Sequence, residues 1–312
     1  MGQPIIAVTG ATGAQGGGLV RAILADPEQR FAVRAITRNP DSDSAKALAA
    51  QGCEVVRADL DDVDSLRAAF AGAYGAFCVT NFWEHFSAPR ETQQAKNLAQ
   101  AAKEAGVQHV VWSTLEDTRK AFPLDDERMP TLHGHYKVPH FDGKGEADAT
   151  FTALGVPTTF LHTSFYWDNI ATVMPPRPGA DGSMQFVLPM GDNLLSGIAA
   201  ADIGAVAYGI FKRPELIGKV VGAAGEHLTV QQMADAMTRH LGKAVTYVPV
   251  PPSVYRGFGF PGADDLGNMF QYYAETEAAF VALRDVAFAR ELHPGLLTFE
   301  QWLDQNKARI PV

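Results

Sequence analysis

The fold is decided near the start of the chain by the stretch that reads Ile5-Ile6-Ala7-Val8-Thr9-Gly10-Ala11-Thr12-Gly13-Ala14-Gln15-Gly16. Its first four residues are apolar, as in a strand buried on both faces, and the glycine-rich turn leads into a helix-compatible segment. Gly10 allows a tight turn, Gly13 lets the backbone approach a pyrophosphate, and Gly16 allows close contact between helix and strand. The helix N-terminus then offers unpaired N–H groups to phosphates. A purely structural turn is the alternative interpretation.

Short apolar runs alternate with helix-compatible segments over the first half of the chain. The expected strands are 5–8, 31–36, 54–56, 75–79, 109–113 and 158–161, and the expected helices are 17–24, 44–51, 63–70, 93–104 and 145–153. Strands separated by helices specify a parallel sheet with right-handed crossovers. We therefore predict an α/β fold with a doubly wound parallel sheet, the Rossmann arrangement.

The regular alternation loosens beyond about residue 165. We expect residues 1–165 to form a dinucleotide-binding Rossmann domain and residues 166–312 to form a smaller α+β region for a substrate or partner. A helix near 201–212 is expected to pack back on the first domain. Thr229 and Thr298 are placed as N-caps of two later helices.

Composition excludes several classes of protein. The 312 residues include 46% hydrophobic and 20% charged residues, which are ordinary values for a globular chain. The formal net charge of −9 disfavours direct nucleic-acid binding. Two cysteines, Cys53 and Cys78, favour a reducing compartment over a disulfide framework. Neither a signal peptide nor a membrane-length apolar segment is found, so a cytoplasmic protein is expected.

The end of the second expected strand carries the residue that distinguishes two dinucleotides. An acidic residue at this place binds the ribose hydroxyls of NAD, but here the residue is Arg38, followed by Asn39. A guanidinium matches a 2′-phosphate, so NADP(H) is preferred over NAD(H), unless Arg38 is only a solvated loop residue. Asp59 and Leu60, after the third strand, occupy the usual adenine position, although Asp59 fits a helix N-cap equally well.

Three residues form an incomplete catalytic set. Short-chain dehydrogenases place a serine after the fifth strand and a Tyr-x-x-x-Lys helix over the nicotinamide. Ser113 has the serine position and Lys144 the lysine position, but His140 stands where the tyrosine would be. Tyr136 is eight residues before Lys144, so it cannot take the place of the missing tyrosine, which lies four residues before the lysine. His140 can act as the acid because histidine titrates near neutrality, or it can be a polar residue at the domain edge.

Five motifs spread along the chain make the pattern more specific than a generic Rossmann fold. They are Thr9-Gly10-Ala11-Thr12-Gly13-Ala14-Gln15-Gly16-Gly17, Thr37-Arg38-Asn39-Pro40, Thr80-Asn81-Phe82-Trp83-Glu84, His140-Phe141-Asp142-Gly143-Lys144-Gly145-Glu146 and Gly259-Phe260-Pro261-Gly262-Ala263-Asp264-Asp265-Leu266-Gly267-Asn268-Met269-Phe270. Together they resemble the NmrA-like family, an atypical branch of the extended short-chain dehydrogenases.

The resemblance implies a set of dinucleotide-binding residues. They are Gly10, Ala11, Thr12, Gly13, Ala14, Gln15, Arg38, Asn39, Asp59, Leu60, Thr80, Asn81, Phe82, Lys144, Tyr166, Trp167, Asp168 and Asn169. The last four would flank the nicotinamide. Asp41, Asp43 and Gln93 stand where a redox-sensing member of the family carries basic residues, which implies a weaker NADP selectivity here.

Two functions follow from these features. The resemblance and the missing tyrosine favour an NADP(H)-binding redox sensor that regulates a protein partner, and a homodimer is also considered. The alternative is an NADPH-dependent reductase of quinone- or enone-like molecules, because aromatic residues gather near the expected nicotinamide. These residues are Phe82, Trp83, Phe86, Phe165, Tyr166 and Trp167, although an ordinary core also explains many of them. A metal site is not expected.

Overall fold

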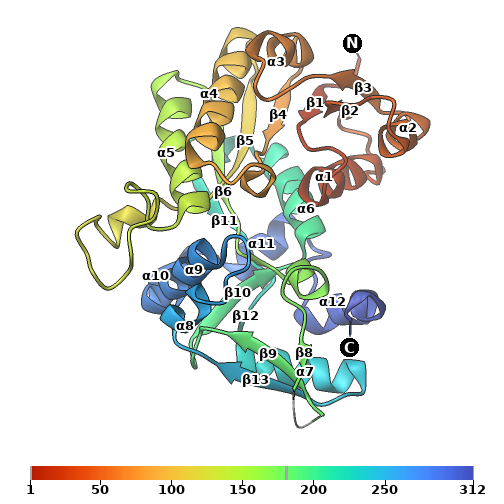
Figure 1. Ribbon diagram of the computed structural model, residues 1–312. Helices are drawn as coiled ribbons and strands as arrows, with labels where there is room; N and C mark the ends of the chain where they lie inside the picture. Colours follow the sequence, from red (N-terminus) through yellow and green to blue (C-terminus); the bar gives the residue numbers. More distant parts are fainter. Residues whose placement is uncertain (1, 180–181, 312) are drawn as a thin grey trace.

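A seven-stranded, all-parallel sheet forms the centre of the N-terminal region (Figure 1). The computed structural model describes residues 2–179 and 182–311. The strand order is β11-β6-β5-β4-β1-β2-β3. The strands are β1 (Ile5–Val8), β2 (Ala32–Thr37), β3 (Glu54–Arg57), β4 (Gly75–Cys78), β5 (His109–Thr114), β6 (Thr158–His162) and β11 (Val220–Gly222). The chain order reverses between β1 and β4, where the carboxyl ends of parallel strands open a crevice for a ligand.

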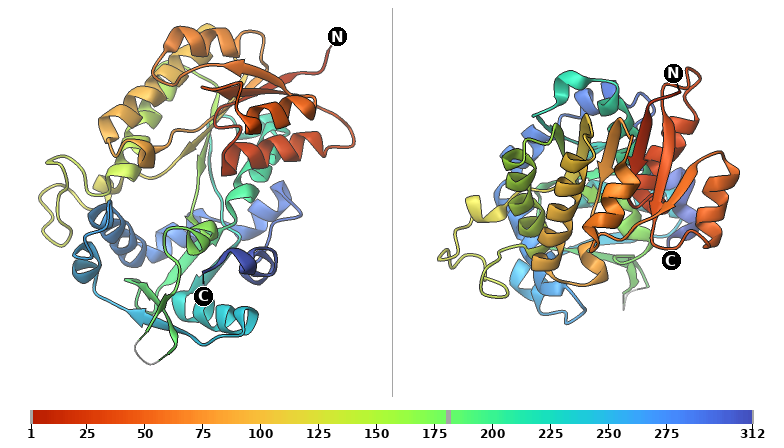
Figure 2. Two further views of the ribbon diagram at one scale, coloured as in Figure 1. Left: turned by 45° about the vertical axis from the view of Figure 1, so that its right-hand side comes forward. Right: turned by 90° about the horizontal axis from the view of Figure 1, so that it is seen from above.

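Helices cover both faces of this sheet (Figure 2). One face is covered by α1 (Ala14–Leu24), α6 (Ala200–Phe211) and α11 (Val286–Leu292), with α2 (Asp43–Ala50) at the edge. The other face is covered by α3 (Val63–Phe70), α4 (Ala88–Glu104) and α5 (Pro139–Ala153). Apolar side chains from both helical layers meet the buried strand residues, so the sheet is covered on both sides as all-parallel sheets require.

The contact between α1 and α6 is unusually close because two glycines lie in it. A Cβ atom on Gly204 of α6 would lie 2.1 Å from the backbone nitrogen of Leu19, and one on Gly18 of α1 would lie 2.1 Å from the carbonyl oxygen of Ala201. No side chain fits either place. This contact fixes α6, which comes from the second half of the chain, against the helix that follows the glycine-rich turn.

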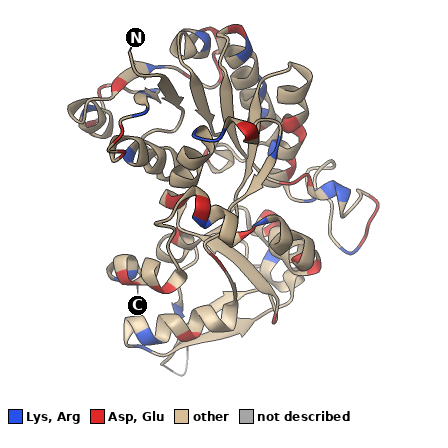
Figure 3. Ribbon diagram, turned by 180° about the vertical axis from the view of Figure 1, so that it is seen from behind, with Lys and Arg blue, Asp and Glu red and all other residues tan. Residues whose placement is uncertain are grey.

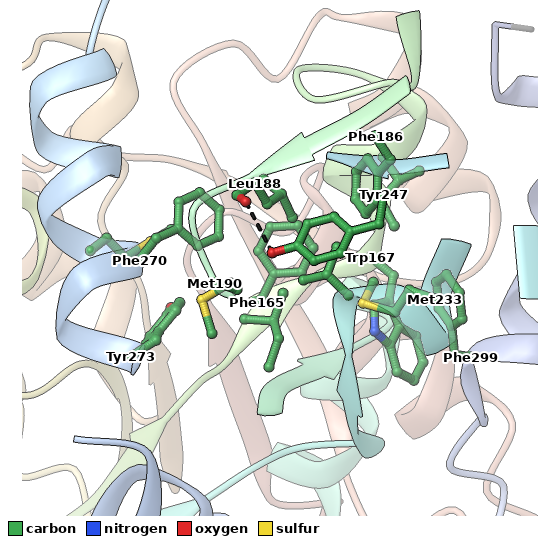
Figure 4. Close-up of a cluster of buried hydrophobic side chains, with 14 of the residues drawn as sticks. Phe165, Trp167, Phe186, Leu188, Met190, Met233, Tyr247, Phe270, Tyr273 and Phe299 are labelled. Carbon is green, nitrogen blue, oxygen red and sulfur yellow. Dashed lines mark hydrogen bonds between the residues drawn. The ribbon is translucent and has the colours of Figure 1, made fainter. Parts of the chain in front are cut away.

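The C-terminal region contains two three-stranded sheets and most of the remaining helices. One sheet has the order β12-β10-β7 and the other β13-β9-β8. The strands are β7 (Phe165–Tyr166), β8 (Arg177–Pro178), β9 (Met184–Leu188), β10 (Leu194–Ile198), β12 (Glu226–Thr229) and β13 (Val245–Pro249), and the helices are α7 (Val230–Leu241), α8 (Pro252–Arg256), α9 (Ala263–Glu275), α10 (Glu277–Leu283) and α12 (Phe299–Asn306). Their shared core is aromatic and methionine-rich, and Tyr247 donates to the carbonyl oxygen of Leu188 over 3.1 Å within it (Figure 4).

The predicted fold class is confirmed, while three helix starts differ from the sequence-based expectation by three residues or more. Helix α1 begins at Ala14 rather than 17, α4 at Ala88 rather than 93, and α5 at Pro139 rather than 145. The return of α6 to the first layer was expected, but the seventh strand, β11, was not. Thr229 and Thr298 do cap α7 and α12, each through a reciprocal capping box. No helix in residues 2–179 and 182–311 is long and apolar enough to span a membrane.

Charged side chains are dispersed over the molecule. In Figure 3, acidic and basic residues are scattered over both regions. Many of them form exposed ion pairs, such as Arg67 with Glu104 and Arg90 with Asp61. This dispersion, together with the net charge of −9, provides no broad basic face on the side shown for a nucleic-acid backbone.

Candidate functional site

The glycine-rich turn leaves the start of α1 open to a ligand. Gly10 has a φ of +60°, and its carbonyl oxygen accepts from the N–H of Gly13 over 2.8 Å. A Cβ atom on Gly16 would lie 2.3 Å from that same oxygen, so this position must be glycine. Gly13 is the N-cap without a side-chain bond, and the first turn of α1 carries no acidic residue. The first N–H groups of the helix therefore face outward without a capping side chain, as an anionic phosphate requires.

A buried ion pair lies at the carboxyl end of β4. The ammonium of Lys144 in α5 donates to Thr80 Oγ1 over 2.7 Å and lies 3.1 Å from Glu91 Oε1. The Thr80 hydroxyl in turn donates to Glu91 Oε1 over 2.6 Å. The Glu91 carboxylate is fully buried, and its Oε2 atom has no hydrogen-bond partner among the described residues. Lys144 is thus held in one place, next to the expected position of a nicotinamide ribose.

His140 precedes Lys144 by one helical turn and has an acidic partner from the C-terminal region. Because α5 begins at Pro139, both side chains lie on the same face of one helix. The imidazole Nδ1 pairs with Asp265 Oδ1 of α9, and the backbone N–H of His140 donates to Asp265 Oδ2 over 3.2 Å. Both residues are buried. The ring centroid lies 4.9 Å from those of Trp83 and Phe141, so the imidazole is enclosed by aromatic side chains.

A cavity of about 870 Å³ lies between the two regions at this point. Gln15, Thr80, Asn81 and Lys144 line its side next to the glycine-rich turn. The rest of its wall is mainly aromatic and aliphatic, and includes Phe82, Trp83, Phe86, Leu115, His140, Phe141, Phe165, Tyr166, Asn169, Val173, Met174, Val187, Tyr255, Phe258, Phe260, Leu266, Met269 and Tyr273. Such a cavity accommodates a flat apolar molecule with a few polar groups.

The residues expected at the adenosine end lie together but are not all free. The guanidinium of Arg38 pairs with the carboxylate of Glu84, and both side chains are more than two-fifths exposed. This pairing and the charge of Asp59 nearby raise the pKa of Arg38 further. Asp59 and Asn39 are also exposed, and Leu60 is half-buried. Asp62, not Asp59, caps α3, so the alternative interpretation of Asp59 as that N-cap is not supported.

Gln15 connects the glycine-rich turn with two other predicted site residues. Its side-chain amide donates to the Tyr166 hydroxyl over 2.7 Å, and its oxygen accepts from the Ser113 hydroxyl over 2.8 Å. Burial is the main reason that the pKa of Tyr166 is raised to about 12, so the phenol stays protonated at neutral pH. Tyr166 lines the cavity, whereas Ser113 is buried and is not among its described lining residues.

Two predicted cofactor-flanking residues serve other contacts in the described structure. Trp167 is buried, with its ring centroid 5.4 Å from that of Phe299, in the core of the C-terminal region. Asp168 accepts from the backbone N–H of Ala200 over 2.9 Å and thereby caps α6. Of the four residues Tyr166 to Asn169, only Tyr166 and Asn169 line the cavity.

Sequence reasoning missed three charged residues of this site. Glu91 looks like a solvent-facing residue of a helix, and its burial depends on Lys144 from a different helix. Asp265 and Glu84 lie in the motifs described above, but the sequence does not indicate that Asp265 pairs with His140 or that Glu84 pairs with Arg38. Each partner is distant in sequence, so one sequence offers no signal for the pairing. The helix-start signal at Pro139 could have placed His140 and Lys144 on one helix.

Comparison with known proteins agrees with this geometry. The sequence profile of the NmrA-like family matches residues 3–303. The chain belongs to the NmrA-like family. Among curated relatives, the NmrA-like family domain-containing oxidoreductase FrzB of Cladobotryum sp is 32% identical, covering 89% of this chain and 86% of its own length. The oxidoreductase of the same description, lnbB of Aspergillus flavus, is 31% identical and covers 98% of each chain.

Solved structures of this family superpose on nearly the whole molecule. NmrA, described as a negative transcriptional regulator, is 25% identical with a TM-score of 0.79, covering 97% of this chain and 95% of its own. It has been solved in complex with NAD and in complex with NADP, each with a TM-score of 0.78. An NADPH-dependent quinone oxidoreductase of Escherichia coli shares the fold with a TM-score of 0.74 at 24% identity.

Proposed function

We propose that this NmrA-like protein is an NADP(H)-dependent reductase of a flat, conjugated, apolar molecule such as a quinone or an enone. The observation that carries the proposal is the cavity of about 870 Å³, which has a largely aromatic wall and is continuous with the residues around the glycine-rich turn. Gln15, Thr80 and Lys144 line the cavity and also belong to the residues around the glycine-rich turn. A dinucleotide on the turn and a substrate in the cavity would therefore share a boundary. The oxidoreductase descriptions of the fungal relatives support the same class of reaction.

The residues around the turn fit a dinucleotide. Gly10, Gly13 and the uncapped start of α1 would hold the pyrophosphate, Lys144 the nicotinamide ribose, and Arg38 the 2′-phosphate of NADP(H). The complexes of NmrA with NAD and with NADP support this assignment. When bound, the reduced nicotinamide supplies a hydride. Because Glu84 pairs with Arg38, the 2′-phosphate of NADP(H) would compete with the Glu84 carboxylate for the guanidinium. This competition would set the preference for NADP(H) over NAD(H).

The chain's own residues provide orientation and an apolar environment. Phe82, Trp83 and Phe141 offer ring faces to a planar substrate and exclude water from the reacting atoms. Lys144 supplies positive charge next to developing negative charge on a carbonyl oxygen. Because a hydroquinone anion is a stable product, reduction of a quinone places little demand on a proton donor.

Turnover can be tested directly. Purified protein should oxidise NADPH above the uncatalysed background with at least one member of a panel of quinones and enones. The variant K144M should lose most of that rate, since it removes the buried ammonium. K96M, which alters an exposed lysine of the neighbouring helix α4, should keep it. If no acceptor raises NADPH oxidation above background, this proposal fails.

A redox sensor is the second candidate, because the chain is 25% identical to the transcriptional regulator NmrA and carries His140 in place of the usual tyrosine. A sensor must bind the reduced and oxidised dinucleotide with different affinity or change shape with only one of them. Calorimetric titration with NADPH and NADP⁺, combined with light scattering, measures both. Equal affinities without a change in mass or shape would eliminate the sensor.

A further inference from the structure

The contact between His140 and Asp265 has no role in the function described so far. Asp265 lies in the segment 259–270, and its side chain is 5% exposed. Its two oxygens bind one residue at two points, the imidazole Nδ1 and the backbone N–H of His140. A bidentate arrangement of this kind fixes both the position of the ring and its rotation about the side-chain bonds.

The surrounding structure holds the pair in place from both regions. The side-chain amide of Asn268, one turn after Asp265 in α9, donates to the carbonyl oxygen of Lys137 over 2.6 Å. From the opposite direction, Asp142 of α5 accepts from the backbone N–H of Lys137 over 2.8 Å. The start of α5 is therefore clamped between α9 and its own first turn. Such support is what a preorganised functional group requires.

The chemistry of the two groups determines which nitrogen carries a proton. An ionised carboxylate only accepts hydrogen bonds, so Nδ1 of His140 must be the donor in its pair with Asp265. The imidazole lines the cavity, and its other nitrogen, Nε2, makes no hydrogen bond to the residues that the structure describes. When the ring is protonated, Nε2–H is the donor that remains for a ligand in the cavity.

We propose that Asp265 is a positioning residue that fixes the tautomer and orientation of His140, so that Nε2 of His140 gives a proton to the oxygen of a bound carbonyl substrate. This inference rests on the proposed reductase function and deepens it. It favours substrates that need a proton during reduction, namely enones, over those that do not, namely quinones. His140, four positions before Lys144, would then be the proton donor through its imidazole, in place of the tyrosine that short-chain dehydrogenases use.

The atoms and electrons of the reaction balance. A hydride from the reduced nicotinamide adds to the β-carbon of the enone, and the displaced π electrons move to the carbonyl oxygen. That oxygen takes the proton from Nε2–H of the imidazolium, which leaves neutral imidazole with Nδ1–H still bound to Asp265. The substrate gains a hydride and a proton, the dinucleotide is oxidised, and solvent returns the proton to His140.

Kinetics with two classes of acceptor test the proposal. H140Q and D265N should each lower kcat for an enone by about 10²–10⁴-fold, the range found for loss of a general acid or its orienting carboxylate, with little change in KM. The loss for a quinone should be much smaller. D264N is the matched control, because Asp264 is the exposed neighbour on the same helix, and it should behave as the wild type. Equal losses for enone and quinone in D265N would overturn the proposal.

NMR of isotope-labelled histidine provides a readout without turnover. In spectra recorded at a pH high enough for the ring to be neutral, the His140 signal, assigned by its absence in H140Q, should show the remaining proton on Nδ1, and D265N should shift that proton towards Nε2. An unchanged tautomer in D265N would overturn the positioning role of Asp265. If the wild type reduces neither class of acceptor, the reductase proposal fails, and the NMR result alone then decides whether Asp265 sets the tautomer.

Discussion

Arg38 is the residue through which the chain can recognise a 2′-phosphate, and Glu84 competes for its guanidinium. Both side chains are well exposed, at 60% and 44%, so solvent screens the pair. An exposed pair of this kind contributes about 0.2–1 kcal/mol, so E84Q should raise the ratio of NADPH to NADH affinity by up to about 5-fold. Calorimetric titration with each dinucleotide measures the ratio. E104Q, at an exposed ion pair with Arg67 distant from the site, is the control. A ratio that stays constant or falls in E84Q would show that Glu84 does not compete.

Asp148 in α5 makes stability depend on pH in an unusual direction. Burial raises the pKa of this carboxyl to about 6, although Thr114 and Trp112 both donate to its Oδ1. Because the folded pKa lies above the unfolded value of about 3.9, the stabilisation is complete below the unfolded pKa and is lost as pH rises through 6. D148N keeps the accepting Oδ1 but cannot ionise.

The free energy of unfolding should therefore fall less in D148N than in the wild type between about pH 4 and pH 7, by up to about 3 kcal/mol. Denaturant titrations at a series of pH values measure this difference. D64N, at an exposed carboxylate in α3, serves as the control. Parallel curves for D148N and wild type would mean that Asp148 ionises in the folded protein as it does in the unfolded chain.

The packing of α1 against α6 depends on the absence of side chains. A methyl group at Gly204 would meet the backbone of α1 at 2.1–2.2 Å, where no flexible side chain can move aside. G204A should therefore lower the free energy of unfolding by about 3 kcal/mol or more, although alanine favours a helix more than glycine does. G257A, whose methyl group would meet nothing closer than 3.3 Å, should change it little. Thermal unfolding of both variants distinguishes specific contact from a general effect of glycine.

Helix positions were predicted well from the sequence, and helix starts poorly. The sequence-based helix begins at residue 145, yet α5 begins at Pro139. Glycine is required within α5 by tertiary packing, because a Cβ atom on Gly145 would lie 2.5 Å from the backbone nitrogen of Asp117. In α4, the N-cap Ser87 and the proline that follows in the first turn are a start signal that was present in the sequence.

For the molecule as a whole, the parallel sheet, the glycine-rich turn and part of the aromatic cavity wall followed from the sequence, but the rest of the cavity did not. Strand periodicity and glycine positions are local signals, and they placed Gly10 correctly between the first strand and the first helix, whereas His140 and Lys144 fell just before the helix expected from residue 145. The cavity wall comes from both regions, and Tyr255, Phe258 and Phe260 give no sign in the sequence that they line the same cavity as Trp83 and Phe86. The strands of the two smaller sheets were not predicted either, although β9, β10 and β13 are each longer than β1.

A buried ion pair joins the two regions. Arg284, which ends α10, is fully buried and donates to both carboxylate oxygens of Glu116 over 2.7 and 3.0 Å. Burial alone would raise the pKa of Glu116, but the charge of Arg284, its hydrogen bonds and the nearby His162 ring lower it to about 2. The pair therefore stabilises the fold above the unfolded pKa of about 4.3, and this stabilisation is lost as pH falls towards 2.

The variant E116Q leaves the guanidinium of Arg284 buried without its counter-charge. At neutral pH we expect E116Q to lower the free energy of unfolding by about 3–5 kcal/mol, which corresponds to a fall in Tm on the order of 10 °C. E291Q removes an exposed partner of Arg213 and should change stability by less than about 0.5 kcal/mol. The difference in the free energy of unfolding between wild type and E116Q should narrow as pH falls from about 5 to about 2, because the wild-type carboxyl then becomes neutral as well. If the difference in the free energy of unfolding stays constant over this range, the stabilisation comes from shape and packing and not from the charge of Glu116.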